Sequence, residues 1–204
     1  MDDELNEEKK WLSKASNRIL EHSTVVYLFI LTVSVYVCKF HHSNFVEILS
    51  PDSFKMPSVQ VFILSLISCV ILLCFNLLFE TSSVYFRRQQ ILTAIYTRPL
   101  KFFGLAYIAL LSSVGEEFFF RACLQPYLGI VLTSFLVSLL HLGSTFRVSG
   151  WTLYVGMRSL LFGVLFFFTG SLIPCLVVHF ILNLCFLFRG GFLLNLEKIS
   201  VEKN

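Results

Sequence analysis

The sequence has little charge. Of its 204 residues only 14% are Asp, Glu, Lys or Arg, whereas 56% are hydrophobic. The mean hydropathy of +0.76 lies outside the range of ordinary soluble domains. These values exclude a soluble globular protein and predict an integral membrane protein that contacts the lipid bilayer. The net charge of +3 is small and scattered, so we expect no nucleic-acid partner.

Paired cysteines, strand patterns and internal repeats are also lacking. The six cysteines all lie in apolar runs, and none has the CxxC spacing of a metal or redox site. We therefore expect them to behave as small hydrophobic residues rather than as a disulfide framework or a metal site. The cysteines are Cys38, Cys69, Cys74, Cys123, Cys175 and Cys185.

Long apolar runs are what the sequence does contain. A membrane-spanning helix needs about 20 mainly apolar residues, and six runs qualify: residues 24–40, 58–79, 102–124, 129–146, 151–169 and 171–188. The expected fold is an all-α, polytopic bundle of about six transmembrane helices. We expect an interfacial helix over residues 1–22, a transmembrane domain over 23–190 with its core at 102–188, and a polar tail over 191–204. The pattern "RGG" at Arg189, Gly190 and Gly191 predicts a helix end.

Basic residues are distributed unevenly between these runs. If the amino terminus is cytoplasmic, nearly all Lys and Arg outside the spans lie on the cytoplasmic side, and only Lys39 and Lys55 lie on the other. The positive-inside rule then predicts a multi-pass protein with both termini in the cytoplasm, in the cell membrane if the protein is bacterial. For Arg158, inside a span, we favour snorkelling or bonding to the backbone over a position facing a cavity.

The stretch "GEEFFFR" places three charges inside the third apolar run. Glu117 and Arg121 are four residues apart, so on a helix they share a face and can form an ion pair. Glu116 is then the unpaired carboxylate. Ionisable groups at membrane depth tend to face a protein interior or an aqueous cavity, which makes Glu116 a candidate general base.

Two later runs carry further polar groups. His141 lies in the fourth run, and His179 and Asn183 lie four residues apart in the sixth. Glu116, His141 and His179 fall near the middles of their predicted spans, so we expect them in one layer. A carboxylate, two imidazoles and a neutral amide can activate a water molecule and stabilise an oxyanion.

These segments resemble a known family. "EEFFFR" has the form EExxxR, "HFILN" has the form HxxxN, and "LLFGVLFFFTGSLIPCLVVHFILN" is similar to the glycine-containing span, TGSL turn and second histidine helix of the CAAX protease and bacteriocin-processing (CPBP, or ABI) membrane proteases. The resemblance covers about residues 102–188. It implies that Glu116 activates water, that Glu117 and Arg121 complete the first motif, that His141 is the second-motif histidine, and that His179 with Asn183 forms the third motif.

Two positions depart from the family pattern. Val137 stands where the family usually has phenylalanine, and Ala122 stands where it usually has glycine after the motif arginine. Neither change removes a reactive group. They concern the packing of the site and the shape of its substrate.

The expected activity is hydrolysis of a peptide bond in a membrane-associated protein or peptide. Glu116, His141 and His179 would also make a catalytic zinc set, and members of the family are described both as metalloproteases and as metal-independent glutamate proteases. We favour no cofactor, because Asn183 is a poor zinc ligand and a good hydrogen-bonder. A non-catalytic immunity or scaffold protein and a proton-coupled transporter are the alternatives, although transporters often show two related halves.

Overall fold

The structure is a computed structural model that describes residues 2–40, 49–50, 54–142 and 147–202. Its described residues form helices and no strand, which confirms the all-α prediction. The elements are α1 (Asp2–Phe40), α3 (Ser58–Ser82), α4 (Val84–Thr97), α5 (Phe102–Glu117), the π-helix η2 (Phe118–Leu124), α6 (Gln125–Leu140), α7 (Gly150–Thr169) and α8 (Ile173–Glu202).

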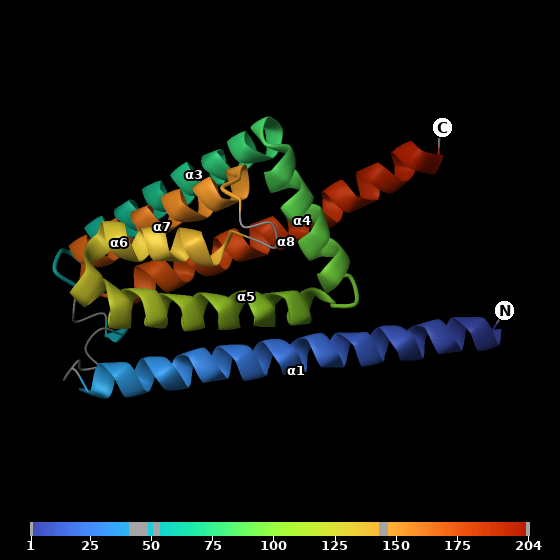
Figure 1. The fold of residues 1–204 in the computed structure, drawn as a ribbon, viewed down its shortest axis with the longest axis horizontal. Coiled ribbons are helices and arrows are strands. Elements are labelled where there is room, and N and C mark those ends of the chain that lie inside the picture. Colours follow the sequence, from blue (N-terminus) through green and yellow to red (C-terminus); the bar gives the residue numbers. More distant parts are fainter. Residues whose placement is uncertain (1, 41–48, 51–53, 143–146, 203–204) are drawn as a thin grey trace.

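Within the described residues, five helical stretches are long and apolar enough to cross a membrane, which supports a multi-pass membrane protein. They are Ser13–Lys39, Ser58–Ser82, Phe102–Leu140, Gly150–Thr169 and Ile173–Leu196. Figure 1 shows that the third stretch is not one straight rod, because the chain turns back between α5 and α6, and α6 packs mainly against α7. Its two arms account for the third and fourth of the segments expected from the sequence.

The fold-back occurs at Gly129. Its φ of 71° and ψ of 175° interrupt the helical backbone inside α6. A side chain is strained at such a positive φ, whereas glycine adopts it readily. The residues of α6 after this bend pack against α7. The glycine near Pro126 therefore separates two membrane segments that length and hydropathy alone would merge.

Both ends of the chain differ from the expected domain boundaries. The first helix is continuous from Asp2 to Phe40, so residues 2–22 are not a separate helix. The helix end expected at Arg189, Gly190 and Gly191 is wrong, because α8 continues to Glu202. A Cβ atom on Gly190 would lie 2.6 Å from the backbone oxygen of Gln90 in α4. This glycine allows α4 and α8 to approach closely rather than stopping the helix.

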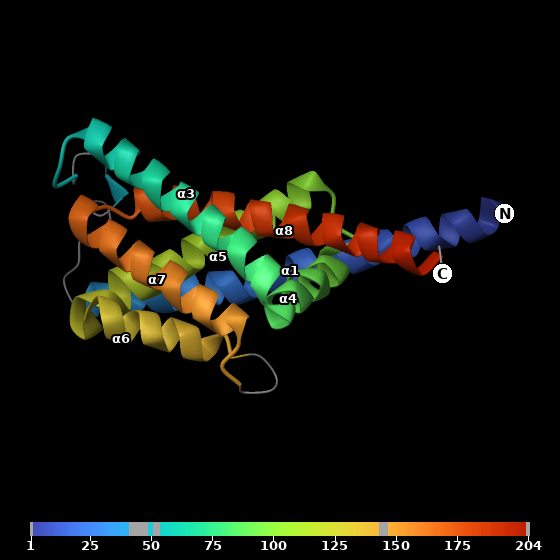
Figure 2. The ribbon, with the colours of Figure 1, turned by 90° about the horizontal axis from the view of Figure 1, so that it is seen from above.

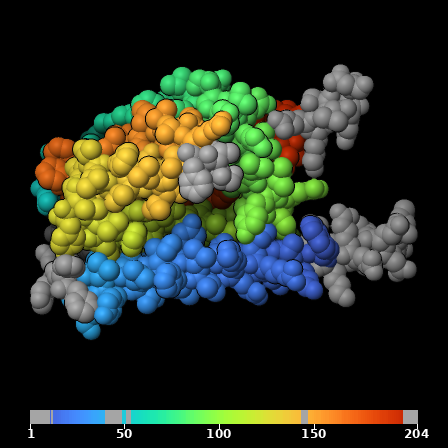
Figure 3. All heavy atoms as spheres, viewed as in Figure 1, coloured from blue at the N-terminus to red at the C-terminus, as the bar shows by residue number. Residues whose placement is uncertain are grey.

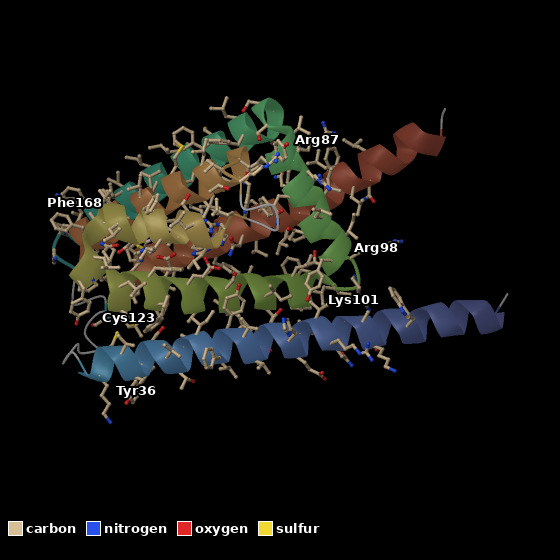
Figure 4. All side chains as sticks on the ribbon, in the orientation of Figure 1. Tyr36, Arg87, Arg98, Lys101, Cys123 and Phe168 are labelled. Carbon is tan, nitrogen blue, oxygen red and sulfur yellow. The ribbon has the colours of Figure 1, made fainter. Side chains whose placement is uncertain are left out.

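The two termini lie at the same end of the bundle (Figures 1 and 2). Arg87, Arg98 and Lys101 lie toward that end, and Cys123 and Phe168 lie at the other (Figure 4). In the space-filling view α1 runs along one side of the molecule (Figure 3). It packs mainly against α5 and η2 and is the least buried of the candidate spans.

The core that positions the site lies where α3, α7 and α8 meet. Leu72, Phe162, Leu165 and Leu182 are fully or almost fully buried there. Aromatic rings from α4, α7 and α8 extend this packing toward the end that carries the termini. The polar groups described next lie between these apolar layers and α5, so they are held in fixed positions by their neighbours.

Candidate active site

Glu117 and Arg121 form the ion pair that their spacing predicts. Arg121 Nε lies 3.2 Å from Glu117 Oε2, and the side chains are 1% and 2% exposed. The same guanidinium donates to Gln125 Oε1 at 3.0 Å and to Ser159 Oγ at 2.6 Å. Arg121 therefore has partners on its own segment and on α7, which offsets part of the cost of burying its charge.

Glu117 has a second partner that sequence reasoning missed. Its Oε1 accepts a hydrogen bond of 2.8 Å from Nδ1 of His179 on α8. A carboxylate can only accept, so the Nδ1 atom carries the hydrogen and Nε2 of a neutral imidazole is left with its lone pair. Glu117 thus links Arg121 to His179 and fixes which nitrogen of the imidazole faces away from it.

Glu116 lies on the other side of that imidazole. Its Oε2 is 3.9 Å from His179 Nε2 and 3.9 Å from Arg158 Nη2, and its side chain is 18% exposed. These separations are too long for direct hydrogen bonds but suit groups that share a small molecule such as water. His179 Nε2 is itself buried and has no hydrogen-bond partner. Glu116 is therefore the more accessible of the two carboxylates and lies next to this unpartnered nitrogen.

Asn183 is held by two neighbours. Arg158 Nη1 donates to its Oδ1 at 3.1 Å, and its Nδ2 donates to Ser112 Oγ at 2.8 Å. Because arginine has donors only, the oxygen of the amide must face Arg158. The expectation that Arg158 snorkels is wrong, since this residue is 7% exposed and lies inside the site. Its position within a span, without an evident partner in the sequence, was the signal that could have identified it.

Tyr27 of α1 is a further member of the site that the sequence did not reveal. Its hydroxyl interacts with Ser112 and Glu116. A Cβ atom on Gly115 would lie 2.8 Å from Tyr27 Cδ1, so glycine at this position of α5 lets the tyrosine ring approach. No pattern in the apolar first span distinguishes this tyrosine from those that face lipid.

His141 is placed elsewhere. It follows the last residue of α6, its Nδ1 bonds to the Val137 carbonyl at 2.8 Å, and its ring packs 6.3 Å from the Trp151 ring. It lies at the end of its helix rather than near the middle of a span. Among the contacts of the described residues, none joins it to Glu116 or His179. The structure therefore brings together Glu116, Glu117, Arg121, His179 and Asn183, and adds Arg158, Ser112 and Tyr27.

A catalytic zinc ion does not fit this arrangement. Within the part of the chain that the structure describes, no group of three or more His, Cys, Asp or Glu side chains could hold a metal ion. Ligands of a tetrahedral zinc ion at about 2.1 Å lie roughly 3.4 Å apart, whereas Glu116 Oε2 and His179 Nε2 are 3.9 Å apart. The third expected ligand, His141, is not with them. The donor set Glu116, His141 and His179 is thus incomplete in this structure.

Fold and site together define a multi-pass membrane protein with a charged, hydrogen-bonded cluster between its helices. Residues 98–185 match the family model described as Rce1-like, "Type II CAAX prenyl endopeptidase Rce1-like". This match bears out the resemblance of the region to the CPBP membrane proteases. It contains every site residue named above except Tyr27.

A curated relative aligns with part of the chain. The chain is 32% identical over 85 residues to the Bacillus subtilis (strain 168) protein named "Uncharacterized protein YpbD". The alignment covers 40% of this chain and 43% of the relative, so the chain spans less than half the length of the curated relative it matches. The comparison with solved structures found no match.

Proposed function

We propose that the protein is a membrane endopeptidase that cleaves a membrane-associated protein or peptide with a water molecule activated by Glu116. The observation that carries the proposal is the pair formed by Glu116 Oε2 and His179 Nε2. They face each other across 3.9 Å, and the opposite nitrogen of the imidazole is fixed by Glu117. The Rce1-like match supports an endopeptidase at the level of the family.

In the proposed reaction a water molecule binds between these two atoms. Glu116 accepts a proton from the water, and the hydroxide oxygen bonds to the carbonyl carbon of the scissile peptide. Glu116 then returns the proton to the leaving amine nitrogen. His179 holds the water through Nε2, while the Glu117 carboxylate keeps the imidazole in the required tautomer and orientation.

Asn183 and Arg158 are suited to the negative charge that develops on the carbonyl oxygen. One N–H of the Asn183 amide is donated to Ser112, and the second is available to an oxyanion. Arg158 orients the amide through Oδ1 and places its positive charge beside Glu116. Donors that are already oriented stabilise a transition state without having to reorganise during the reaction.

The charges of the site balance when His179 is neutral. Glu116 and Glu117 carry two negative charges, and Arg121 and Arg158 carry two positive charges. A neutral cluster costs less to bury among apolar helices than a charged one. Proton transfer from water to Glu116 moves charge within the cluster and leaves this balance unchanged, which favours the proposed step.

The substrate class follows from the family model and the location of the site. Rce1-like proteins are described as CAAX prenyl endopeptidases, and a CAAX sequence is a carboxyl-terminal motif whose cysteine is prenylated. A prenylated peptide partitions into the bilayer, from which it reaches a site between membrane helices. We propose a peptide of this kind as the test substrate, with no metal or other cofactor.

The test compares purified wild-type protein with two isosteric variants. A fluorogenic peptide that ends in a farnesylated CAAX sequence is incubated with each protein in lipid vesicles, and the products are identified by mass spectrometry. Glu116→Gln should abolish cleavage without lowering the amount of folded protein, because the amide cannot act as a base. Glu80→Gln changes a carboxylate of α3 that pairs with Arg189, and it should leave the chemistry intact.

Cleavage by Glu116→Gln at the wild-type rate would refute the glutamate mechanism. Absence of cleavage by the wild type, for prenylated and unprenylated peptides alike, would argue against the endopeptidase and favour a non-catalytic role. Proton uptake by vesicles without cleavage would favour the transporter alternative.

A further inference from the structure

Cys38 and Cys123 lie in contact although they are 85 positions apart in the chain. Cys38 is near the end of α1, and Cys123 is in η2. Their sulfur atoms are 2.8 Å apart, well inside the van der Waals separation of two sulfur atoms. Each cysteine is only 1% exposed. The structure holds both cysteines as buried thiols, as the sequence predicts, but it sets them against each other.

The surroundings of the pair leave two chemical roles, a thiol contact or a disulfide. Phe118, Ala122 and Leu172 pack around the two sulfurs. Cys123 Sγ also lies 3.1 Å from the carbonyl oxygen of Ser34, one turn before Cys38. A metal site would need further ligands, and the described residues offer no group of three or more His, Cys, Asp or Glu for one.

The position of the pair in the molecule favours the disulfide. Cys123 lies at the end of the bundle opposite both termini (Figure 4). Under the positive-inside rule this end is on the far side of the membrane, because Arg87, Arg98 and Lys101 lie toward the other end. Disulfides form and persist in extracytoplasmic compartments and are rare in the cytoplasm.

We propose that Cys38 and Cys123 form a disulfide bond that fastens α1 to η2, the segment that carries Arg121. The bond forms when the two thiols lose two protons and two electrons. The oxidant is a disulfide of a thiol–disulfide exchange protein or of a small thiol on that side of the membrane, and it is reduced to two thiols. The S–H bonds break and one S–S bond replaces them.

Fastening this helix matters for the site because α1 supplies Tyr27. The helix packs mainly against α5 and η2 and is the least buried of the candidate spans. Between α1 and α5 a groove of about 630 Å³ opens, lined by residues that include Thr24, Val25 and Tyr107. Because this groove lies along one part of the contact between α1 and α5, packing alone holds α1 less firmly there. A covalent link at the Cys38 end keeps Tyr27 beside Ser112 and Glu116.

The experiment detects the bond in the full-length protein. A protease recognition sequence is inserted between α1 and α3, and thiols are blocked with N-ethylmaleimide as the membranes are dissolved in a denaturing detergent, so that buried thiols react as well. After cleavage, the two fragments should migrate as one species on a non-reducing gel and separate when reductant is added. Cys38→Ser and Cys123→Ser should separate without reductant, whereas Cys175→Ser, which alters a buried cysteine of α8, should behave as the wild type.

Mass spectrometry gives a count that does not depend on any variant folding. The chain has six cysteines, so the blocked protein should carry four alkylated thiols before reduction and six afterwards. Fragments of the wild type that separate without reductant, together with six alkylated thiols, would overturn the proposal and assign the pair as a thiol contact.

The effect of the disulfide on the stability of the helix bundle is tested by the midpoint of thermal unfolding of the uncleaved protein. Reductant should lower the midpoint of the wild type and leave that of Cys38→Ser unchanged. Equal midpoints of the wild type with and without reductant would show that the bond does not secure α1.

Discussion

The carboxylate of Glu117 accepts a hydrogen bond of 2.8 Å from Nδ1 of His179, and both side chains are at most 2% exposed. The residues are 62 positions apart, and each belongs to a different motif of the sequence. Their contact joins the ion pair of η2 to the histidine that faces Glu116. The two motifs therefore form one hydrogen-bonded unit, in which a change at Glu117 reaches the site through His179.

Replacing Glu117 tests this unit. Glu117→Gln leaves Arg121 buried without its counter-charge, so we expect a loss of about 3–5 kcal/mol in the free energy of unfolding. The amount of folded protein after purification and its unfolding by denaturant measure the loss.

The double variant Glu117→Leu with Arg121→Met separates the effect of the ion pair on stability from the effect of Glu117 on the orientation of the His179 imidazole. It removes both charges and should recover part of the stability, but its activity should stay low, because His179 Nδ1 has no acceptor. A double variant as unstable as the single one would show that the two charges do not stabilise each other. Restored activity would show that the bond to His179 is dispensable.

Arg158 is expected to act in the reaction rather than in folding. In Arg158→Met the Asn183 amide loses its orienting donor and Glu116 loses a neighbouring positive charge, so we expect kcat to fall about 10²-fold or more. KM should change less. Arg147→Met removes an exposed cation that precedes α7 and serves as the control. Equal kcat values for the Arg158 variant and the wild type would remove this residue from the proposed machinery.

Chelation separates the two mechanisms that the sequence leaves open. Because the structure offers Glu116 and His179 without a third ligand, we expect activity to persist after treatment with a chelator. Elemental analysis of the active protein should find no stoichiometric zinc. Activity that disappears with the chelator and returns with added zinc would refute the metal-independent scheme and leave the endopeptidase assignment in place.

The neighbouring glycines of α8 make a matched pair. A methyl group on Gly190 would collide with the Gln90 carbonyl of α4, whereas a methyl group on Gly191 meets nothing within 4 Å. Gly190→Ala should lower the free energy of unfolding by about 1–3 kcal/mol through overpacking. Gly191→Ala should be neutral or stabilising by up to about 1 kcal/mol, because alanine favours a helix. Equal effects would contradict the close contact between α4 and α8.

The orientation is tested by labelling single cysteines in an otherwise cysteine-free protein. Arg98→Cys should react with a membrane-impermeant maleimide only when the cytoplasmic face is accessible, and Lys55→Cys only from the opposite face. The reason is the concentration of basic residues toward the end that carries both termini. The reverse pattern would place the termini outside and would move the Cys38 and Cys123 pair to the cytoplasmic side.

Much of the architecture followed from local features of the sequence. Apolar runs as long as a bilayer is thick predict membrane helices whatever their order in the bundle. Glu117 and Arg121 were predicted as partners because four residues make one turn of a helix, and the structure confirms their contact. The family resemblance rested on spacing within single segments, which the match over residues 98–185 bears out.

The predictions that failed depended on contacts between segments. Gly190 was interpreted as a helix end because its neighbour α4 was not known, and Arg158 was expected to snorkel because Asn183 is 25 positions away. His141 was placed near the middle of an assumed span, whereas α6 ends at Leu140, directly before it. Each error came from treating a helix as if it had no neighbours.

The sequence by itself determined that the protein lies in a membrane, where its helices form and which reactive side chains they carry, because hydropathy and helical spacing are local properties. Only the tertiary structure decided which groups meet. It placed His179 between two adjacent carboxylates, brought Arg158 to Asn183, and set Cys38 against Cys123. These contacts depend on how the helices bend at Gly129 and pack across the bundle, and that packing is a collective property of many side chains.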